Sequence, residues 1–127
     1  MQNNNTCIST ILIVDDNPVN NKLLKAVLES RSYAVRIASS GAQALQEIEE
    51  SIPDLVMLDV MMPEMTGYEV CQIIRRNPKT RSLPIVMLTA LDHVLEKVKG
   101  IEAGADDFLS KPINQAELFA RIELLSI

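Results

Sequence analysis

Three aspartates of this chain stand where they could hold a metal ion and react beside it. Asp15 and Asp16 follow the apolar run 11–14, and Asp59 follows the apolar run 55–58. Short apolar runs of this kind are typical of buried β-strands. If the two strands are parallel neighbours, the three carboxylates meet in one crevice, where each close pair would repel by ~4 kcal/mol at an effective dielectric of 20. Such a cluster predicts a hard divalent cation, with chemistry at a carboxylate beside it.

Segments typical of strands and helices alternate along the whole chain. Strands are predicted over about 10–15, 34–38, 54–59, 85–88 and 107–110. Helices are predicted from Pro18, capped by Asn17, from a cap at Ser40, and over about 68–76, 94–103 and 115–125. This alternation favours one parallel sheet covered by helices on both faces. We expect a flavodoxin-like α/β fold of five parallel strands in the order 2-1-3-4-5 with five flanking helices, and its switch point lies where the three aspartates fall.

Composition limits the class of protein. A chain of 127 residues with 47% apolar residues predicts one domain with a real core, and we expect it over 10–127 after a flexible lead-in at 1–9. A net charge of −5 argues against nucleic-acid binding by this domain. No apolar run reaches the ~18 residues of a membrane span, and no signal peptide is visible. Two cysteines, Cys7 and Cys71, give no disulfide framework, so a cytoplasmic location is expected.

Two more polar residues stand at predicted strand ends. Thr89 ends the fourth strand and Lys111 ends the fifth. The loop after the third strand contains Pro63 and Gly67, which indicate a sharp turn. Taken alone, Thr89 could cap a helix and Lys111 could be a solvated loop residue. Because both lie at the carboxyl ends of strands, we expect them to belong to the same crevice as the aspartates.

Four segments together carry a family resemblance: 14–17, 58–63 with Gly67, 88–90 and 111–112. In this order, at the ends of strands one, three, four and five, they resemble the receiver domain of two-component response regulators. The resemblance extends over about 10–125. It implies a phosphoprotein that acts as a signalling switch, often within a phosphorelay, and promotes only its own phosphoryl transfer and dephosphorylation. It also implies a histidine kinase or a histidine phosphotransfer protein as the phosphodonor.

The resemblance assigns roles to the residues of the crevice. It implies that Asp59 is the phosphoacceptor, forming an acyl phosphate. It implies that Mg²⁺ is held by Asp15, Asp16, Asp59 and the backbone carbonyl of Met61. Two carboxylates and a carbonyl would suffice beside Asp59, because Mg²⁺ keeps several of its waters.

The resemblance also implies which residues bind the phosphoryl group and which respond to it. Lys111 would pair with the phosphoryl group, aimed by a cis peptide bond at Pro112, and Thr89 would donate its hydroxyl. Phe108 would turn inward as Thr89 moves, although it could also be a plain core residue. Helix four, strand five and helix five would then form the output surface. A homodimer through helices four and five, and an output domain outside this chain, are the expected readouts.

The residues leave two other functions open. A small Mg²⁺-dependent phosphohydrolase with an aspartyl-phosphate intermediate would carry two acids separated by one residue after strand one, whereas Asp15 and Asp16 are adjacent. A flavin-binding electron carrier would need a Ser-, Thr- and Gly-rich phosphate loop there.

Several charged residues outside the crevice are expected to be solvated. Arg75 and Arg76 should form the exposed end of the third helix, and Asp106 and Asp107 an exposed turn before the fifth strand. His93 should lie on an exposed turn without a partner.

Overall fold

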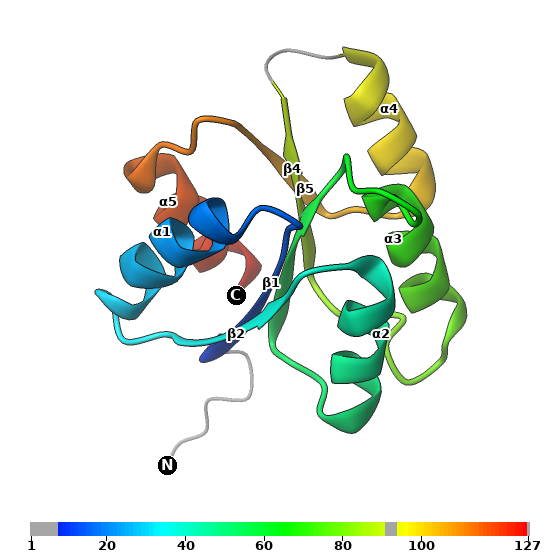
Figure 1. The fold of residues 1–127 in the computed structure, drawn as a ribbon, viewed down its shortest axis with the longest axis horizontal. Helices are drawn as coiled ribbons and strands as arrows, with labels where there is room; N and C mark the ends of the chain where they lie inside the picture. The colour runs from blue at the N-terminus through cyan, green and yellow to red at the C-terminus, as the bar shows by residue number, and fades with distance from the viewer. Residues whose placement is uncertain (1–7, 91–93, 127) are drawn as a thin grey trace.

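Five parallel strands form a sheet with helices against both of its faces in the computed structural model of this chain (Figure 1). The structure describes residues 8–90 and 94–126. The strand order is β2-β1-β3-β4-β5, which confirms the predicted topology. The strands are β1 (Thr10–Val14), β2 (Ala34–Ala38), β3 (Leu55–Asp59), β4 (Ile85–Thr89) and β5 (Asp107–Ser110).

Four helices connect the strands and a fifth follows β5, and each begins within a residue or two of its predicted start. They are α1 (Pro18–Glu29), α2 (Gly41–Glu50), α3 (Gly67–Arg76), α4 (Val94–Ala103) and α5 (Gln115–Leu125). Helices α1 and α5 cover one face of the sheet, and α2, α3 and α4 cover the other (Figure 1). None of the helices in the described part of the chain has the length and hydropathy of a membrane span. The predictions for His93 and for residues 1–7 of the lead-in lie outside the described residues.

Side-chain caps start the helices that follow the strands. Asn17 accepts hydrogen bonds from the backbone N–H groups of Val19 and Asn20 at 2.9 and 3.2 Å. Thr66 and Glu69 form a reciprocal capping box at the start of α3. Such caps satisfy N–H groups that have no partner inside the helix. The caps therefore fix where α1 and α3 begin near the carboxyl edge of the sheet, where Asp15 and Asp59 lie.

The three central strands are buried on both faces. Ile11, Ile13 and Met57 belong to the cluster under α1 and α5, whereas Leu12 and Leu58 belong to the cluster under α2, α3 and α4. Alternate residues of a strand point to opposite faces, so a sheet covered on both faces needs continuous apolar runs. Packing on both sides thus fixes the carboxyl ends of β1 and β3.

The expectation that Arg75 is solvated was wrong, because its side chain is only 19% exposed, whereas Asp106 is exposed as expected. The Arg75 guanidinium donates to the backbone carbonyls of Gly104 at 2.8 Å and Leu83 at 2.7 Å, and pairs with the Asp106 carboxylate at 2.9 Å. Asp106 also accepts a hydrogen bond from the backbone N–H of Ile85 at 2.8 Å. These contacts fasten the end of α3 to the turn between α4 and β5.

We expect Gly104→Ala to lower the free energy of unfolding by about 1–3 kcal/mol. Gly104 has φ of +108°, which L side chains rarely adopt, and an added Cβ would lie 2.8 Å from Cγ of Arg75. Urea denaturation measures the loss, with Ala116→Ser on the exposed side of α5 as a control that should change by less than about 0.5 kcal/mol. Equal stability of Gly104→Ala and the original protein would show that the turn relaxes without cost.

Candidate functional site

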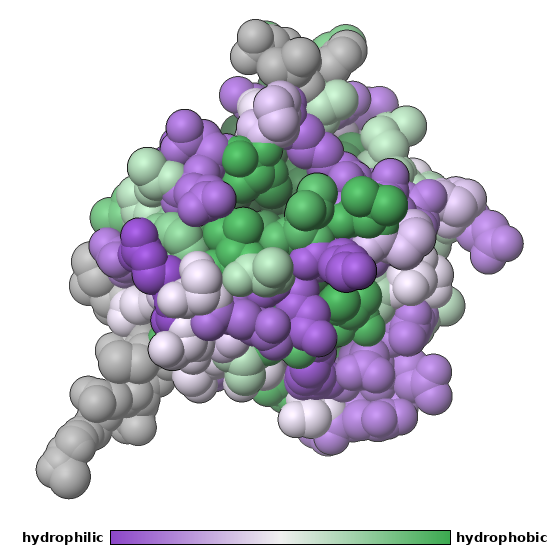
Figure 2. All heavy atoms as spheres, turned by 60° about the vertical axis from the view of Figure 1, so that its left-hand side comes forward, coloured by the Kyte–Doolittle hydropathy of each residue, from purple (hydrophilic) through white to green (hydrophobic). Residues whose placement is uncertain are grey.

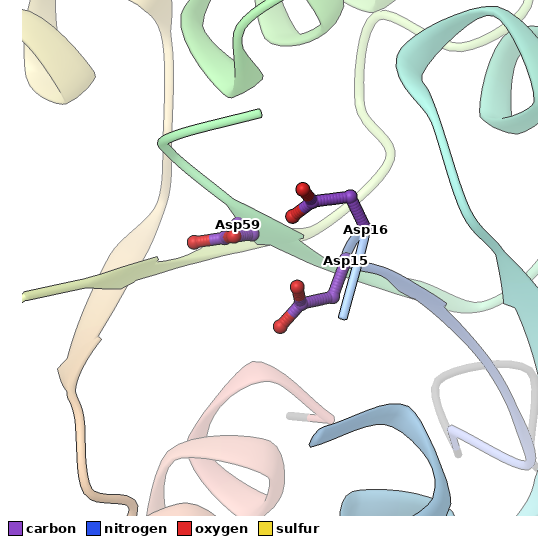
Figure 3. Close-up of side chains that lie close together, drawn as sticks. All are labelled: Asp15, Asp16 and Asp59. Carbon is purple, nitrogen blue, oxygen red and sulfur yellow. The ribbon is translucent and has the colours of Figure 1, made fainter. Parts of the chain in front are cut away.

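The carboxyl ends of β1 and β3 bring the three predicted aspartates together. The two strands pair in parallel, with Val14 beside Leu58. One carboxylate oxygen from each of Asp15, Asp16 and Asp59 lies within 4.8 Å of the others (Figure 3). Asp15 and Asp59 are buried, whereas Asp16 is exposed. The cluster therefore has two acids shielded from water and one at its mouth.

Asparagines of α1 hold the end of β1 in place. The buried side-chain amide of Asn21 donates to the backbone carbonyl of Asp15 at 2.8 Å. One Asp15 carboxylate oxygen accepts the backbone N–H of Asn17 at 2.9 Å. Sequence reasoning missed Asn21, although a buried polar residue on the apolar side of an amphipathic helix could have marked it. Its role is to position Asp15.

Lys111 lies between the two buried carboxylates. Its ammonium nitrogen is 3.1 Å from Oδ1 of Asp59 and 3.3 Å from Oδ2 of Asp15. The backbone N–H of Lys111 donates to the carbonyl of Thr89 at 2.8 Å, which ties the end of β5 to the end of β4. The peptide bond between Lys111 and Pro112 is cis, as the resemblance implied.

The crevice is short of positive charge. Burial raises the pKa of Asp59 to about 6, the ion pair with Lys111 opposes this rise, and the nearby Asp15 adds to it. Burial acts to lower the pKa of Lys111, but its contacts with Asp59 and Asp15 outweigh burial and raise it. Lys111 therefore stays protonated, while ionised Asp59 is held at a cost in free energy.

Two residues shape the loop after β3. Gly67 leaves no room for a side chain, because an added Cβ would lie 2.3 Å from the carbonyl oxygen of Asp59. Its N–H donates to the carbonyl of Val60 at 2.9 Å. Pro63 accepts the N–H of Met65 at 2.7 Å in a tight turn. Met61, at the start of the loop, is 64% exposed. The Gly67 contact shows that the start of α3 packs against the backbone of Asp59.

Thr89 and Phe108 lie on neighbouring strands beside the crevice. Thr89 is fully buried, and its hydroxyl has no hydrogen-bond partner among the described residues. A buried hydroxyl without a partner costs about 1–3 kcal/mol, so this site suits an added oxygen acceptor. Phe108 is partly buried against the cluster under α2, α3 and α4.

The donor set of the crevice fits Mg²⁺. It consists of carboxylate oxygens, and no histidine or cysteine joins the cluster within the described residues. Hard cations such as Mg²⁺ take oxygen ligands, whereas structural zinc sites draw mainly on cysteine and histidine. Among the described residues, Lys111 alone supplies an ammonium group to Asp15 and Asp59, so a second cation would relieve the repulsion of the carboxylates.

We expect Asp59→Asn to raise the free energy of unfolding of the metal-free protein by about 1–3 kcal/mol above pH 7. The pKa of Asp59 is about 6 when folded, against an ordinary value of 3.8. The folded state thus binds more protons between these values, and stability falls as pH rises through that window. The advantage of Asn should shrink as pH falls from 6 towards 4, which urea denaturation in a chelator can follow.

Asp54→Asn is the matched control, with the opposite sign. Burial acts to raise the pKa of Asp54, but hydrogen bonds from the backbone and hydroxyl of Ser9 and the backbone of Thr10 outweigh it and lower the pKa. Asp54→Asn should therefore destabilise the protein at pH 7. Destabilisation by Asp59→Asn as well would contradict a charge-strained crevice.

Comparison with known proteins identifies the family. The family described as "Response regulator receiver domain" matches residues 11–123. The chain is 45% identical over 116 residues to the response regulator PleD of Caulobacter vibrioides, covering 91% of this chain and 26% of PleD. It therefore spans about a quarter of that relative's length.

Two solved structures share the fold over nearly their whole length. The crystal structure of a response regulator from Chloroflexus aurantiacus J-10-fl matches with a TM-score of 0.91 and 42% identity, covering 94% of this chain and 98% of that one. The receiver domain of sensor histidine kinase PA1611 from Pseudomonas aeruginosa PAO1, with a magnesium ion coordinated in its active-site cleft, has a TM-score of 0.87 and 32% identity, covering 94% and 98%. The chain belongs to the receiver-domain family of response regulators, and its function is phosphorylation-dependent signalling.

Proposed function

We propose that Asp59 is the residue phosphorylated and that the phosphodonor is a phosphohistidine. The contact of Lys111 with the buried Asp59 carboxylate, inside a cluster of three acids, is the observation that carries this proposal. A carboxylate oxygen of Asp59 forms the new bond to phosphorus as the phosphorus–nitrogen bond breaks, and the imidazole nitrogen keeps the bonding electrons. The product is an acyl phosphate on Asp59. We take residues 10–127 as the domain that does this.

The chain's own residues have distinct parts in the transfer. Lys111, already 3.1 Å from Oδ1 of Asp59, can shift its contact to a phosphoryl oxygen. Thr89 can donate its unpartnered hydroxyl to another. Asp15, Asp16, Asp59 and the Met61 carbonyl would hold Mg²⁺, and the bound ion would neutralise charge on the phosphoryl oxygens. The magnesium of the PA1611 receiver domain supports this choice of metal.

The face formed by α1 and α5 suits the phosphodonor protein. A groove of about 290 Å³ opens there, and Asp15 and Lys111 are among its lining residues. Figure 2 shows apolar surface gathered on this face. The apolar lining comes from Leu23, Leu24, Val27, Ile113 and Leu118. Lys111 lines this groove and lies 3.1 Å from Asp59, so we propose that a histidine kinase or phosphotransfer protein docks on it. A cytoplasmic location belongs to the same proposal.

Helix α4 is the best candidate for the output surface. Leu95 is 74% exposed, and its neighbours on the same helix are also exposed: Val94, Val98 and Ile101. Single exposed apolar residues are ordinary, but four on one helix indicate a contact surface. We propose that phosphorylation changes the affinity of this surface for a second copy of the chain or for an output domain. We propose that the domain promotes only its own phosphoryl transfer and dephosphorylation.

Acetyl phosphate with Mg²⁺ should place one acid-stable, base-labile phosphate on the protein, detected by mass spectrometry. Asp59→Asn should take none, because an amide oxygen is a poor nucleophile, and Asp54→Asn should be labelled like the original protein. Chelation of Mg²⁺ should abolish labelling. Sustained release of phosphate from many esters would favour the phosphohydrolase instead, and labelling of Asp59→Asn would contradict the assignment.

The phosphate should be long-lived. Met61 and Ala90, which border the crevice, offer no polar side chain to position an attacking water. Leu91, the other residue expected there, lies outside the described residues. We expect Met61→Asn to shorten the half-life of the acyl phosphate, measured after removal of acetyl phosphate, while a surface change such as Ala116→Ser leaves it unaltered. A half-life of seconds in the original protein would contradict this expectation.

A further inference from the structure

Helix α3 begins directly on the backbone of Asp59. An added Cβ at Gly67 would lie 2.3 Å from the carbonyl oxygen of Asp59 and 3.0 Å from Cα of Val60, and the Gly67 N–H donates to Val60 at 2.9 Å. The first turn of α3 is therefore held against the strand end that carries the proposed phosphoacceptor. A shift of that strand end or of its loop must be felt by the next residue, Tyr68.

Tyr68 reaches from this turn to α4. Its hydroxyl donates to the backbone carbonyl of Glu96 at 3.1 Å, across 28 residues of sequence. Its ring packs against the cluster under α2, α3 and α4. Burial raises the pKa of the Tyr68 phenol, and the nearby Glu96 carboxylate raises it further, so the phenol stays neutral and remains a donor.

The same turn of α4 also lies on Phe108. By helix geometry the carbonyl of Glu96 pairs with the N–H of Gly100. An added Cβ at Gly100 would lie 2.4 Å from the ring of Phe108, so the helix backbone rests on that ring. One turn of α4 is thus held by two aromatic side chains, Phe108 from β5 and Tyr68 from the first turn of α3.

We propose that Tyr68 is a positioning residue that couples the state of Asp59 to α4, by a route separate from Thr89 and Phe108. This inference rests on the proposed function, because it needs a phosphoryl group on Asp59. When the loop after β3 adjusts to the phosphoryl group, the start of α3 moves with it, and the hydroxyl of Tyr68 alters its bond to the α4 carbonyl.

The first measurement uses the unmodified protein. The chain has two tyrosines, so ring labelling with ¹³C gives two hydroxyl-carbon NMR signals, assigned with Tyr33→Phe. With acetyl phosphate and Mg²⁺, the Tyr68 signal should shift and the Tyr33 signal should stay, and neither should move in Asp59→Asn. Phosphorylation with an unmoved Tyr68 signal would overturn the inference alone. No phosphorylation of the unmodified protein would overturn the proposed function, and the inference with it.

The second measurement removes only the hydroxyl. Tyr68→Phe should accept phosphate at Asp59 as before. In the original protein, phosphorylation should change the hydrogen-exchange rates of residues 94–103. In Tyr68→Phe this fold-change should be smaller by roughly threefold or more, as expected for the loss of one neutral hydrogen bond. Tyr33→Phe should keep the full response. An unchanged response in Tyr68→Phe would overturn the inference, and if that variant unfolds, the NMR result on the unmodified protein decides.

Discussion

An excess of negative charge at the carboxyl edge of the sheet governs this molecule. In the part of the chain that the structure describes, three carboxylates share a crevice with one ammonium group, that of Lys111. The sheet does not let the acids separate, because Asp15 and Asp59 extend from strands buried on both faces. The only relief is added positive charge or a change in what Asp59 carries. Because its negative charge is unbalanced, the site responds to a cation and to a phosphoryl group. Such a response is what a switch requires.

Close backbone packing turns this local sensitivity into movement elsewhere. Gly67 lies against the carbonyl of Asp59, and Gly100 lies against the ring of Phe108. Neither contact leaves space to absorb a shift, since packed interiors pass displacement on instead of compressing. We therefore expect a change at Asp59 to reach α3 and α4.

The sequence predicted the fold and the crevice well, for a physical reason. The signals are local: apolar runs ending in aspartate, caps such as Asn17, and glycines at tight turns. Local signals can be read directly from the sequence. The contacts of Arg75 with Gly104 and Asp106 join segments about 30 residues apart and have no period or motif to announce them. Tyr68 was missed likewise, because a tyrosine at the start of a helix does not reveal which carbonyl its hydroxyl will meet.

These missed contacts decide where α4 can move. Its C-terminal end adjoins Gly104 and Asp106, which Arg75 holds by charge-assisted bonds of 2.8 and 2.9 Å. Its earlier turn is held by the neutral bond from Tyr68 at 3.1 Å and by contact with the ring of Phe108. Charge-assisted bonds are roughly twice as strong as neutral ones. A helix that is held firmly at one end and weakly near the other moves first at the weakly held end. Movement of α4 should therefore begin at Val94, the end of the helix nearer the carboxyl edge of the sheet, where the phosphoryl group would lie.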